Sequence, residues 1–360
     1  MTRFTLPLLV AAVALALPAN AQQTKMLTAD KHNEYGLIYS LPLTELRIEV
    51  SATHTVRKAG PYWQYARKHI GTDKVVQADA DIWTINDVKI TPYGVADPES
   101  RFLMQLKPGA LTSICVAEDG MLLAINKEVD APQGPPALRP AAVPKAFTGK
   151  EYLQYVGEDF LASQSSAKQA QLLAESLIEV RDAKTSLTRG TAETMPTDGR
   201  QLELMLASLA DQEAALTAAF AGTETTQTVT HTFTFRPERE GRSVLFRMSD
   251  FAGFTDADDY SGEPVYISVS SIKEAELPVD ANGVEKKLPK DAVVYALPGS
   301  ATVSVSMPGR ELYSGSFQIA QFGTTFGLSP AVFTDKKAPS YAIFNPATGA
   351  LETIAEIKAE

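Results

Sequence analysis

The chain has 360 residues, a formal net charge of −10 and one cysteine. Its length is sufficient for two or three domains with hydrophobic cores, and a single cysteine excludes an intrachain disulfide. The acidic balance and the lack of any basic run argue against nucleic acid and anionic membrane surfaces as partners.

The first residues have the three-part layout of a secretory signal peptide. Arg3 supplies a positive start, an uncharged apolar run covers residues 6–17, and the triplet Ala19-Asn20-Ala21 follows. The run is short for a bilayer span, so an uncleaved membrane anchor is the weaker alternative. The sequence therefore predicts a signal peptide at residues 1–21 and export to the periplasm or the extracellular space. Charges interrupt every later apolar stretch, so no membrane span is expected in the mature chain.

Residues 22–128 are predicted to form an N-terminal β-rich unit. From Leu46 to Val56, apolar or small residues alternate with polar ones, which places one set on the buried face of a strand. A short helix is expected over 62–70, ended by Gly71. Further strands are expected at 82–91, 101–106, 111–117 and 121–125. The only cysteine, Cys115, lies in one of them and is predicted to be a buried structural thiol.

A proline-rich linker and a helical hairpin are predicted next. Five prolines fall between Asp130 and Lys145, which favours an extended spacer at 129–149. Residues 150–224 contain two amphipathic stretches, over 166–187 and 200–220, with Asp198 as the expected cap of the second. A Pro/Gly-containing loop between them predicts an antiparallel pair.

Residues 225–360 are predicted to form a C-terminal β-rich unit. Apolar residues alternate with threonine or serine around Val229, Val265 and Val303. Strands that are apolar on one side only are typical of antiparallel sandwiches and barrels. The predicted fold class is therefore α+β, mostly β, with two antiparallel sandwich or barrel-like units flanking a helical hairpin.

Two stretches of the chain begin alike. Tyr39-Ser40-Leu41-Pro42 opens the first β region and Tyr295-Ala296-Leu297-Pro298 opens the last. Each is followed by an alternating strand and then a glycine, Gly60 and Gly315. The pattern suggests duplication of one β unit, and the alternative is the chance repetition of a common strand opener.

The sequence contains no recognisable catalytic constellation. Two Ser-x-x-Lys tetrads, at Ser165 and Ser270, lack the companion motifs of a serine–lysine mechanism. The four histidines, at positions 32, 54, 69 and 231, have no metal-ligand spacing. The acidic stretch from Asp256 to Glu263 is better explained as a surface turn than as a calcium loop. We therefore predict no catalytic, cofactor-binding or metal-ligating residue and no cofactor.

Several short motifs carry a family resemblance. The chain resembles a family of exported Bacteroidetes proteins, labelled domain of unknown function 4831, in the Tyr-x-Leu-Pro opener, Gly60–Gly71, Phe246–Ser249, Ser261–Tyr266 and Gln321–Gly323. The resemblance covers nearly the whole mature chain. It implies a cell-envelope or secreted setting in a Gram-negative bacterium, no particular activity and no site residue.

These observations favour a non-catalytic exported protein that binds a glycan or another envelope protein. The alternative is a secreted hydrolase that acts on polysaccharide with a carboxylate pair, since such a pair comes together only in the fold. A cleft with two facing carboxylates would favour the enzyme, and a surface with exposed aromatic rings would favour binding. The sequence does not determine the oligomeric state.

The signal peptide makes the first prediction. Cleavage is expected after Ala21, because small residues at this triplet fit signal peptidase. Mass spectrometry of the exported protein should find Gln22 as the mature N-terminus. A membrane-bound species that retains Met1 would contradict the prediction.

Overall fold

The structure is a computed structural model, and it describes residues 36–104, 113–130, 148–289, 292–334 and 339–357. The predicted signal peptide and residues 131–147 of the predicted linker lie outside the described residues. Of the described residues, 48 % are in strands and 23 % in helices, and the strands form three antiparallel sheets. The α+β, mostly-β class is thereby confirmed.

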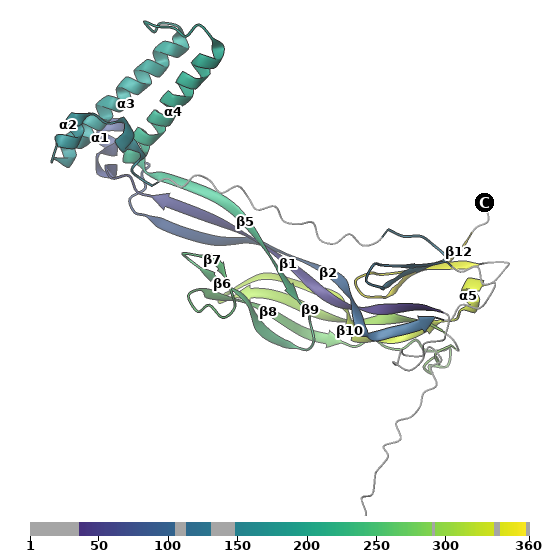
Figure 1. Cartoon of the computed structure of the whole chain (residues 1–360). Helices are drawn as coiled ribbons and strands as arrows, with labels where there is room; N and C mark the ends of the chain where they lie inside the picture. Colours follow the sequence, from purple (N-terminus) through teal and green to yellow (C-terminus); the bar gives the residue numbers. More distant parts are fainter. Residues whose placement is uncertain (1–35, 105–112, 131–147, 290–291, 335–338, 358–360) are drawn as a thin grey trace, which may run out of the picture.

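The first sheet, sheet A, is organised around its central strand. It has the order β2-β1-β5, formed by β1 (Leu37–Lys58), β2 (Ala80–Met104) and β5 (Thr223–Phe235). The stretches expected as two strands at 82–91 and 101–106 fall, as far as residue 104, in the single long strand β2, and residues 105–106 lie outside the described residues. The far half of this sheet continues past the rest of the β structure as a ribbon, which ends at the helices (Figure 1).

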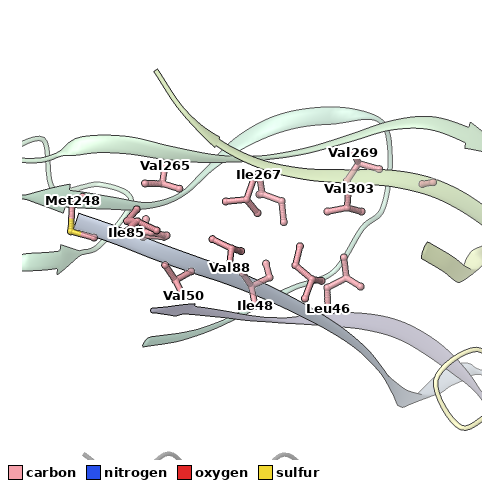
Figure 2. Close-up of a cluster of buried hydrophobic side chains, with 14 of the residues drawn as sticks. Leu46, Ile48, Val50, Ile85, Val88, Met248, Val265, Ile267, Val269 and Val303 are labelled. Atoms are coloured by element: carbon pink, nitrogen blue, oxygen red, sulfur yellow. The ribbon is translucent and has the colours of Figure 1, made fainter. Parts of the chain in front are cut away.

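A larger sheet, sheet C, packs against sheet A. Its order is β10-β9-β8-β6-β7. The strands are β6 (Gly241–Ser249), β7 (Gly253–Thr255), β8 (Glu263–Lys273), β9 (Val293–Met307) and β10 (Arg310–Leu328). Figure 2 shows the apolar side chains of the two sheets pointing toward each other.

The alternation in the sequence explains why these two sheets stack. Leu46, Ile48, Val50 and Ala52 are fully buried on one face of β1, as their spacing of two predicts. They meet the inward residues of sheet C, whose members include Val265, Ile267, Val269, Val303 and Val305. Removal of this apolar area from water stabilises the sandwich.

Sheet B is small and contains strands from both ends of the chain. Its order is β12-β11-β4-β3, with β3 (Ile114–Val116), β4 (Leu122–Ile125), β11 (Ser340–Phe344) and β12 (Leu351–Glu356). Its core includes Tyr39, Ile125, Val294 and Phe344, together with Phe333 from the short helix α5 (Ala331–Thr334). Gly120 adopts a φ of 88° in the β3–β4 turn, a conformation that favours glycine.

The helices form a module at one end of the elongated molecule (Figure 1). They are η1 (Trp63–Tyr65), α1 (Ala66–Ile70), η2 (Glu151–Tyr155), α2 (Glu158–Ala162), α3 (Ser166–Arg189) and α4 (Gly199–Ala221). The predicted helices at 62–70, 166–187 and 200–220 are all present. Asp198 occupies the N-cap of α4, but its side chain makes no capping hydrogen bond, so this expected contact is absent.

The short helix next to β1 belongs to the core of the helical module. Tyr62 and Ala66 pack with Leu173 and Phe220 of the long helices. Gly60 makes this possible, because a Cβ there would lie 2.6 Å from the carbonyl oxygen of Ala219. Residues 62–70, predicted within the N-terminal β-rich unit, therefore pack with the helical hairpin instead.

The two β-rich stretches of the sequence do not form separate cores. Sheet A takes β1 and β2 from the N-terminal stretch and β5 from the C-terminal one, and sheet B likewise combines strands of both. The core between sheets A and C is also shared. The predicted units 22–128 and 225–360 thus describe the order of segments along the chain and not independent packing units.

The strand order repeats along the chain in a way that agrees with the suggested duplication. A long hairpin, β1–β2, is followed by the short pair β3–β4, and a second long hairpin, β9–β10, is followed by β11–β12. The two short pairs meet in sheet B, where β4 lies beside β11. β1 and β9 are each flanked on the other side by a further strand, β5 and β8.

Details of the two long hairpins also correspond. Tyr39 lies opposite Phe102 in the first, and Tyr295 lies opposite Phe326 in the second. Each hairpin then has an irregularity in which one residue of the first strand faces a longer stretch of the second. These stretches are 97–100 in β2 and 320–323 in β10. The similar openers thus begin structurally similar hairpins.

The two hairpins are joined through buried polar contacts. The hydroxyl of Tyr39 donates to the carbonyl oxygen of Val294 at 3.0 Å and accepts from its amide nitrogen at 2.9 Å. Burial raises the pKa of Tyr39, so the phenol stays neutral and keeps the proton that it donates. The first opener is thus bonded to the beginning of β9.

A second set of hydrogen bonds between the two hairpins lies further along β1, at the fully buried Thr44. The side-chain amide of Gln321 accepts from the Thr44 amide nitrogen and donates to the Thr44 carbonyl, both at 2.9 Å. The Thr44 hydroxyl donates to the carbonyl of Ala347 at 2.8 Å and accepts from the Ala320 amide nitrogen at 2.9 Å. The irregular stretch 320–323 is therefore fixed to β1 by hydrogen bonds.

The hydrogen bonds of the Tyr39 hydroxyl give a testable prediction. Tyr39→Phe removes the hydroxyl and leaves the buried amide and carbonyl of Val294 without this partner, which costs about 1–3 kcal/mol of unfolding free energy. Tyr260→Phe is the control, because Tyr260 is 84 % exposed, and a change within about 0.5 kcal/mol is expected there. Denaturant unfolding measures the free energy of unfolding of both variants. Equal losses of this free energy in the two variants would contradict a stabilising role for the Tyr39 hydroxyl.

Candidate binding site

The serines of the two tetrads and the acidic stretch have local structural roles. Ser165 is the N-cap of α3, and its hydroxyl accepts from the Lys168 amide nitrogen. Ser270 lies on β8 where the pairing with β9 shifts register. The carboxylate of Asp259 accepts from the Ser261 amide nitrogen at 3.0 Å, and this bond lowers the pKa of Asp259. The acidic stretch is therefore an Asx turn, as predicted.

The described histidines divide into two groups, and His32 lies outside the described residues. His69 belongs to α1 and lies 6.3 Å from Phe220, ring centre to ring centre, in the helical module. His54 and His231 lie on the inner face of sheet A, where the ribbon leaves the sandwich. Among residues 36–104, 113–130, 148–289, 292–334 and 339–357, no group of histidine, cysteine or carboxylate side chains has the arrangement of a metal site.

Strand pairing brings His54 against Trp83. The two residues are direct partners in the β1–β2 ladder, and their rings stack with centres 4.1 Å apart and planes 7° from parallel. Nε2 of His54 lies 3.1 Å from an Oδ1 oxygen of Asp81, two residues before Trp83. The imidazole is thus held between an indole face and a carboxylate.

The β6–β7 hairpin completes one side of this arrangement. Gly253 has a φ of 70°, and a Cβ there would lie 2.6 Å from the ring of Trp83, so only glycine allows this contact. Phe254 lies beside Trp83, with centres 6.2 Å apart, and beside His231, at 5.3 Å. The ring of His231 stacks in turn on Phe233 at 4.6 Å.

We call this group the aromatic patch. It consists of His54, Trp83, His231, Phe233 and Phe254. Its inner side is part of the sandwich core, because Phe233 stacks on the buried Phe246 at 4.6 Å. Its outer side faces solvent, since His231 is exposed and His54 and Trp83 are half-buried.

One polar atom in the patch has no partner among the described residues. The indole nitrogen of Trp83 is buried, and no acceptor lies within hydrogen-bonding distance of it. An indole N–H is a donor only, and a buried donor without an acceptor is unfavourable.

Two strongly exposed rings lie in the connection between β6 and β8, which contains β7. Phe251 is 91 % exposed and Tyr260 is 84 % exposed. The guanidinium of Arg247 lies 4.5 Å from the centre of the Tyr260 ring and donates to the carbonyls of Ala257 and Gly262. The loop is thus anchored to β6 by Arg247 while it presents two rings to solvent.

The connection between β6 and β8 is rich in exposed carboxylates. Asp250, Asp256, Asp258, Asp259 and Glu263 are all exposed in the β6–β8 connection. Asp81 adds a carboxylate beside His54. This surface would repel an anionic ligand and offers many hydrogen-bond acceptors.

The carboxyl groups with shifted pKa values serve in ion pairs and turns. Burial acts to raise the pKa of Glu45, but hydrogen bonds from Tyr93 and Arg236 outweigh it and lower the pKa below its ordinary value. Hydrogen bonds from Lys184 and Arg181 likewise lower the pKa of Glu213. These carboxylates are charged at neutral pH, whereas the acid of a glycosidase needs a raised pKa.

A further hollow lies along β3 at the edge of sheet B. Its lining residues are Ser113, Ile114, Cys115, Val116, Lys127, Glu128, Val129 and Asp130. Cys115 is half-buried rather than buried, which corrects the prediction, and its Sγ lies 3.5 Å from the carbonyl oxygen of Val129.

The fold and the patch define a mostly-β protein with an aromatic surface patch beside a helical module. The family model described as Domain of unknown function (DUF4831) matches residues 35–352, and the chain belongs to this family. The resemblance predicted from the strand openers and short motifs is confirmed. No curated protein and no solved structure matches the chain.

None of the helices in the described residues has the length and apolar character needed to cross a membrane.

Proposed function

We propose that this chain is an exported, non-catalytic protein of the cell envelope or the secreted fraction that binds a neutral glycan through the aromatic patch and the two exposed rings of the β6–β8 connection, Phe251 and Tyr260. Export rests on the signal-peptide pattern of residues 1–21. The observation that carries the binding function is the patch itself, where stacked and exposed rings lie beside carboxylates and imidazoles.

A sugar ring has an apolar face of C–H groups and a rim of hydroxyls. The apolar face packs favourably on the face of an aromatic ring, and the hydroxyls require donors and acceptors around it. Phe251 and Tyr260 offer exposed ring faces. Asp81 offers acceptor oxygens beside the half-buried ring of His54.

The charge of the surface favours a neutral glycan. The exposed carboxylates of the β6–β8 connection would repel uronic acid or phosphate groups. Uncharged hydroxyls instead donate well to carboxylates.

The test uses the purified chain beginning at Gln22 and a panel of neutral polysaccharides and peptidoglycan. Saturable binding without product is expected, measured by calorimetry and product chromatography. Phe251→Ala with Tyr260→Ala should weaken binding by about tenfold or more, because each ring contact contributes about 0.5–1.5 kcal/mol. Far-UV circular dichroism should be unchanged, since both rings are exposed.

A matched control comes from the opposite end of β8. Val279 and Val284 are 54 % and 61 % exposed in the β8–β9 connection, so Val279→Ala with Val284→Ala truncates two exposed apolar side chains elsewhere. This variant should bind as the parent does. Equal losses in both variants would overturn the assignment of the patch. Turnover that a single Asp or Glu substitution abolishes in a folded variant would establish the hydrolase instead.

A further inference from the structure

Asn282 and Gly283 form an Asn-Gly pair in the connection between β8 and β9. They lie in the turn of a small hairpin, which a bridge between Val279 and Glu285 closes. Residues 279–287 are all exposed, so the pair is in contact with solvent. Neither residue belongs to the aromatic patch, so a role for the pair is separate from glycan binding.

An asparagine that precedes a glycine can modify its own side chain. The main-chain nitrogen of the glycine loses its proton to a base in solvent and attacks the side-chain Cγ of the asparagine. A C–N bond forms, a five-membered succinimide ring closes, and the side-chain amide leaves as ammonia. Water then opens the ring at one of its two carbonyl carbons, which gives aspartate or isoaspartate. Glycine has no Cβ to hinder the ring closure, and asparagine is among the thermolabile residues of proteins.

The four asparagines of the described residues differ in how their side chains are held. The side-chain amides of Asn86, Asn126 and Asn345 each donate to a side-chain or main-chain oxygen. The residues that follow these three are aspartate, lysine and proline. The side-chain amide of Asn282 makes no hydrogen bond within the described residues, and glycine follows it. Asn282 thus combines a side chain that can turn with an unhindered attacking nitrogen.

Asp280 holds the Asn-Gly pair in the closed turn. Its main-chain carbonyl accepts from the Gly283 amide nitrogen at 3.0 Å. Its carboxylate accepts from the amide nitrogens of Val284 at 2.9 Å and Asn282 at 2.8 Å, and these two bonds lower the pKa of Asp280. The carboxylate is therefore charged at neutral pH, and the nitrogen that must attack is held in a hydrogen bond.

The turn opens at small cost, because its side chains bury little apolar area. Val279 and Val284 are 54 % and 61 % exposed. Two further main-chain hydrogen bonds close the hairpin, from Asp280 to Val284 at 2.7 Å and from Lys286 to Pro278 at 2.8 Å. Segments with few buried apolar contacts and exposed hydrogen bonds open locally far more often than a core does. The attacking nitrogen is therefore released by local opening, without unfolding of the sandwich.

We infer that Asn282 is a self-modification site, at which the Gly283 nitrogen displaces ammonia when the turn opens and the bonds to Asp280 limit the rate. The products are aspartate and isoaspartate at position 282. Each adds a carboxylate close to that of Asp280, and isoaspartate also lengthens the main chain by one carbon. Modification thus favours the open form of the hairpin, while the ladder between β8 and β9 does not depend on it.

The first experiment follows the complete chain from Gln22 onward during incubation at mildly alkaline pH. Peptide mapping by mass spectrometry should find a gain of one dalton at Asn282 well before any gain at Asn86, Asn126 or Asn345. The rate should rise with pH, because base removes the proton of the attacking nitrogen. Both products should form, and an enzymatic assay for isoaspartate detects the one that direct hydrolysis of the side chain cannot give.

The second experiment tests the role of Asp280. Asp280→Ala removes the carboxylate that binds two amides of the turn, so the rate at Asn282 should rise by about threefold or more, since the loss of one net hydrogen bond shifts such an equilibrium by about twofold to tenfold. Glu285→Ala is the matched control. It removes an exposed carboxylate of the same hairpin, and Glu285 takes part in the hairpin through its main chain. Its rate should equal that of the parent.

Hydrogen exchange measures the opening directly. The amide of Val284 should exchange faster in Asp280→Ala than in Glu285→Ala, while far-UV circular dichroism stays the same in both. Equal rates of modification in these two variants would overturn the role of Asp280. An Asn282 that is modified no faster than the three bonded asparagines, or that yields aspartate alone, would overturn the self-modification site.

Discussion

The structure depends on strand β1, which pairs with another strand on each side and buries one of its faces against sheet C. β1 is hydrogen-bonded to β2 and to β5 over most of its length, and Leu46, Ile48, Val50 and Ala52 are buried against sheet C. A slip of one residue would turn these side chains to the opposite face. The register of sheet A, and with it the position of the patch residues that sheet A contributes, follows from this constraint.

The same constraint explains why the N- and C-terminal β stretches form one assembly. β5 and sheet C come from the second half of the chain, so β1 cannot complete either its ladder or its core before they are made. The side chains of Tyr39 and Thr44 add hydrogen bonds between the two hairpins at buried positions. The repeated hairpin topology and these hydrogen bonds together agree with a duplicated β unit whose copies remained in contact.

Beyond the sandwich, sheet A serves as a support. Its far half holds the helical module at one end and the aromatic patch at the point where the ribbon leaves the core (Figure 1). The rings of the patch, such as Phe254, are fixed by packing, and the exposed Tyr260 lies on a loop that Arg247 anchors. Rigid placement of rings and acceptors reduces the entropy that a binding site loses when a ligand is bound.

The sequence by itself determined the buried face of the strand from Leu46 and the two helices of the hairpin, since both depend on residue spacing alone. It also determined the family, through short motifs along the chain. Some of the site was visible too, because His54 and His231 fall on predicted apolar faces. The stack of His54 on Trp83 was not, since the residues are far apart in sequence and meet only through the β1–β2 register. Only the tertiary structure decided that the two β stretches share cores and that Gly253 leaves room for the ring of Trp83. Periodicity gives the buried face of a strand but not which strand covers it, because many partners can bury the same apolar area.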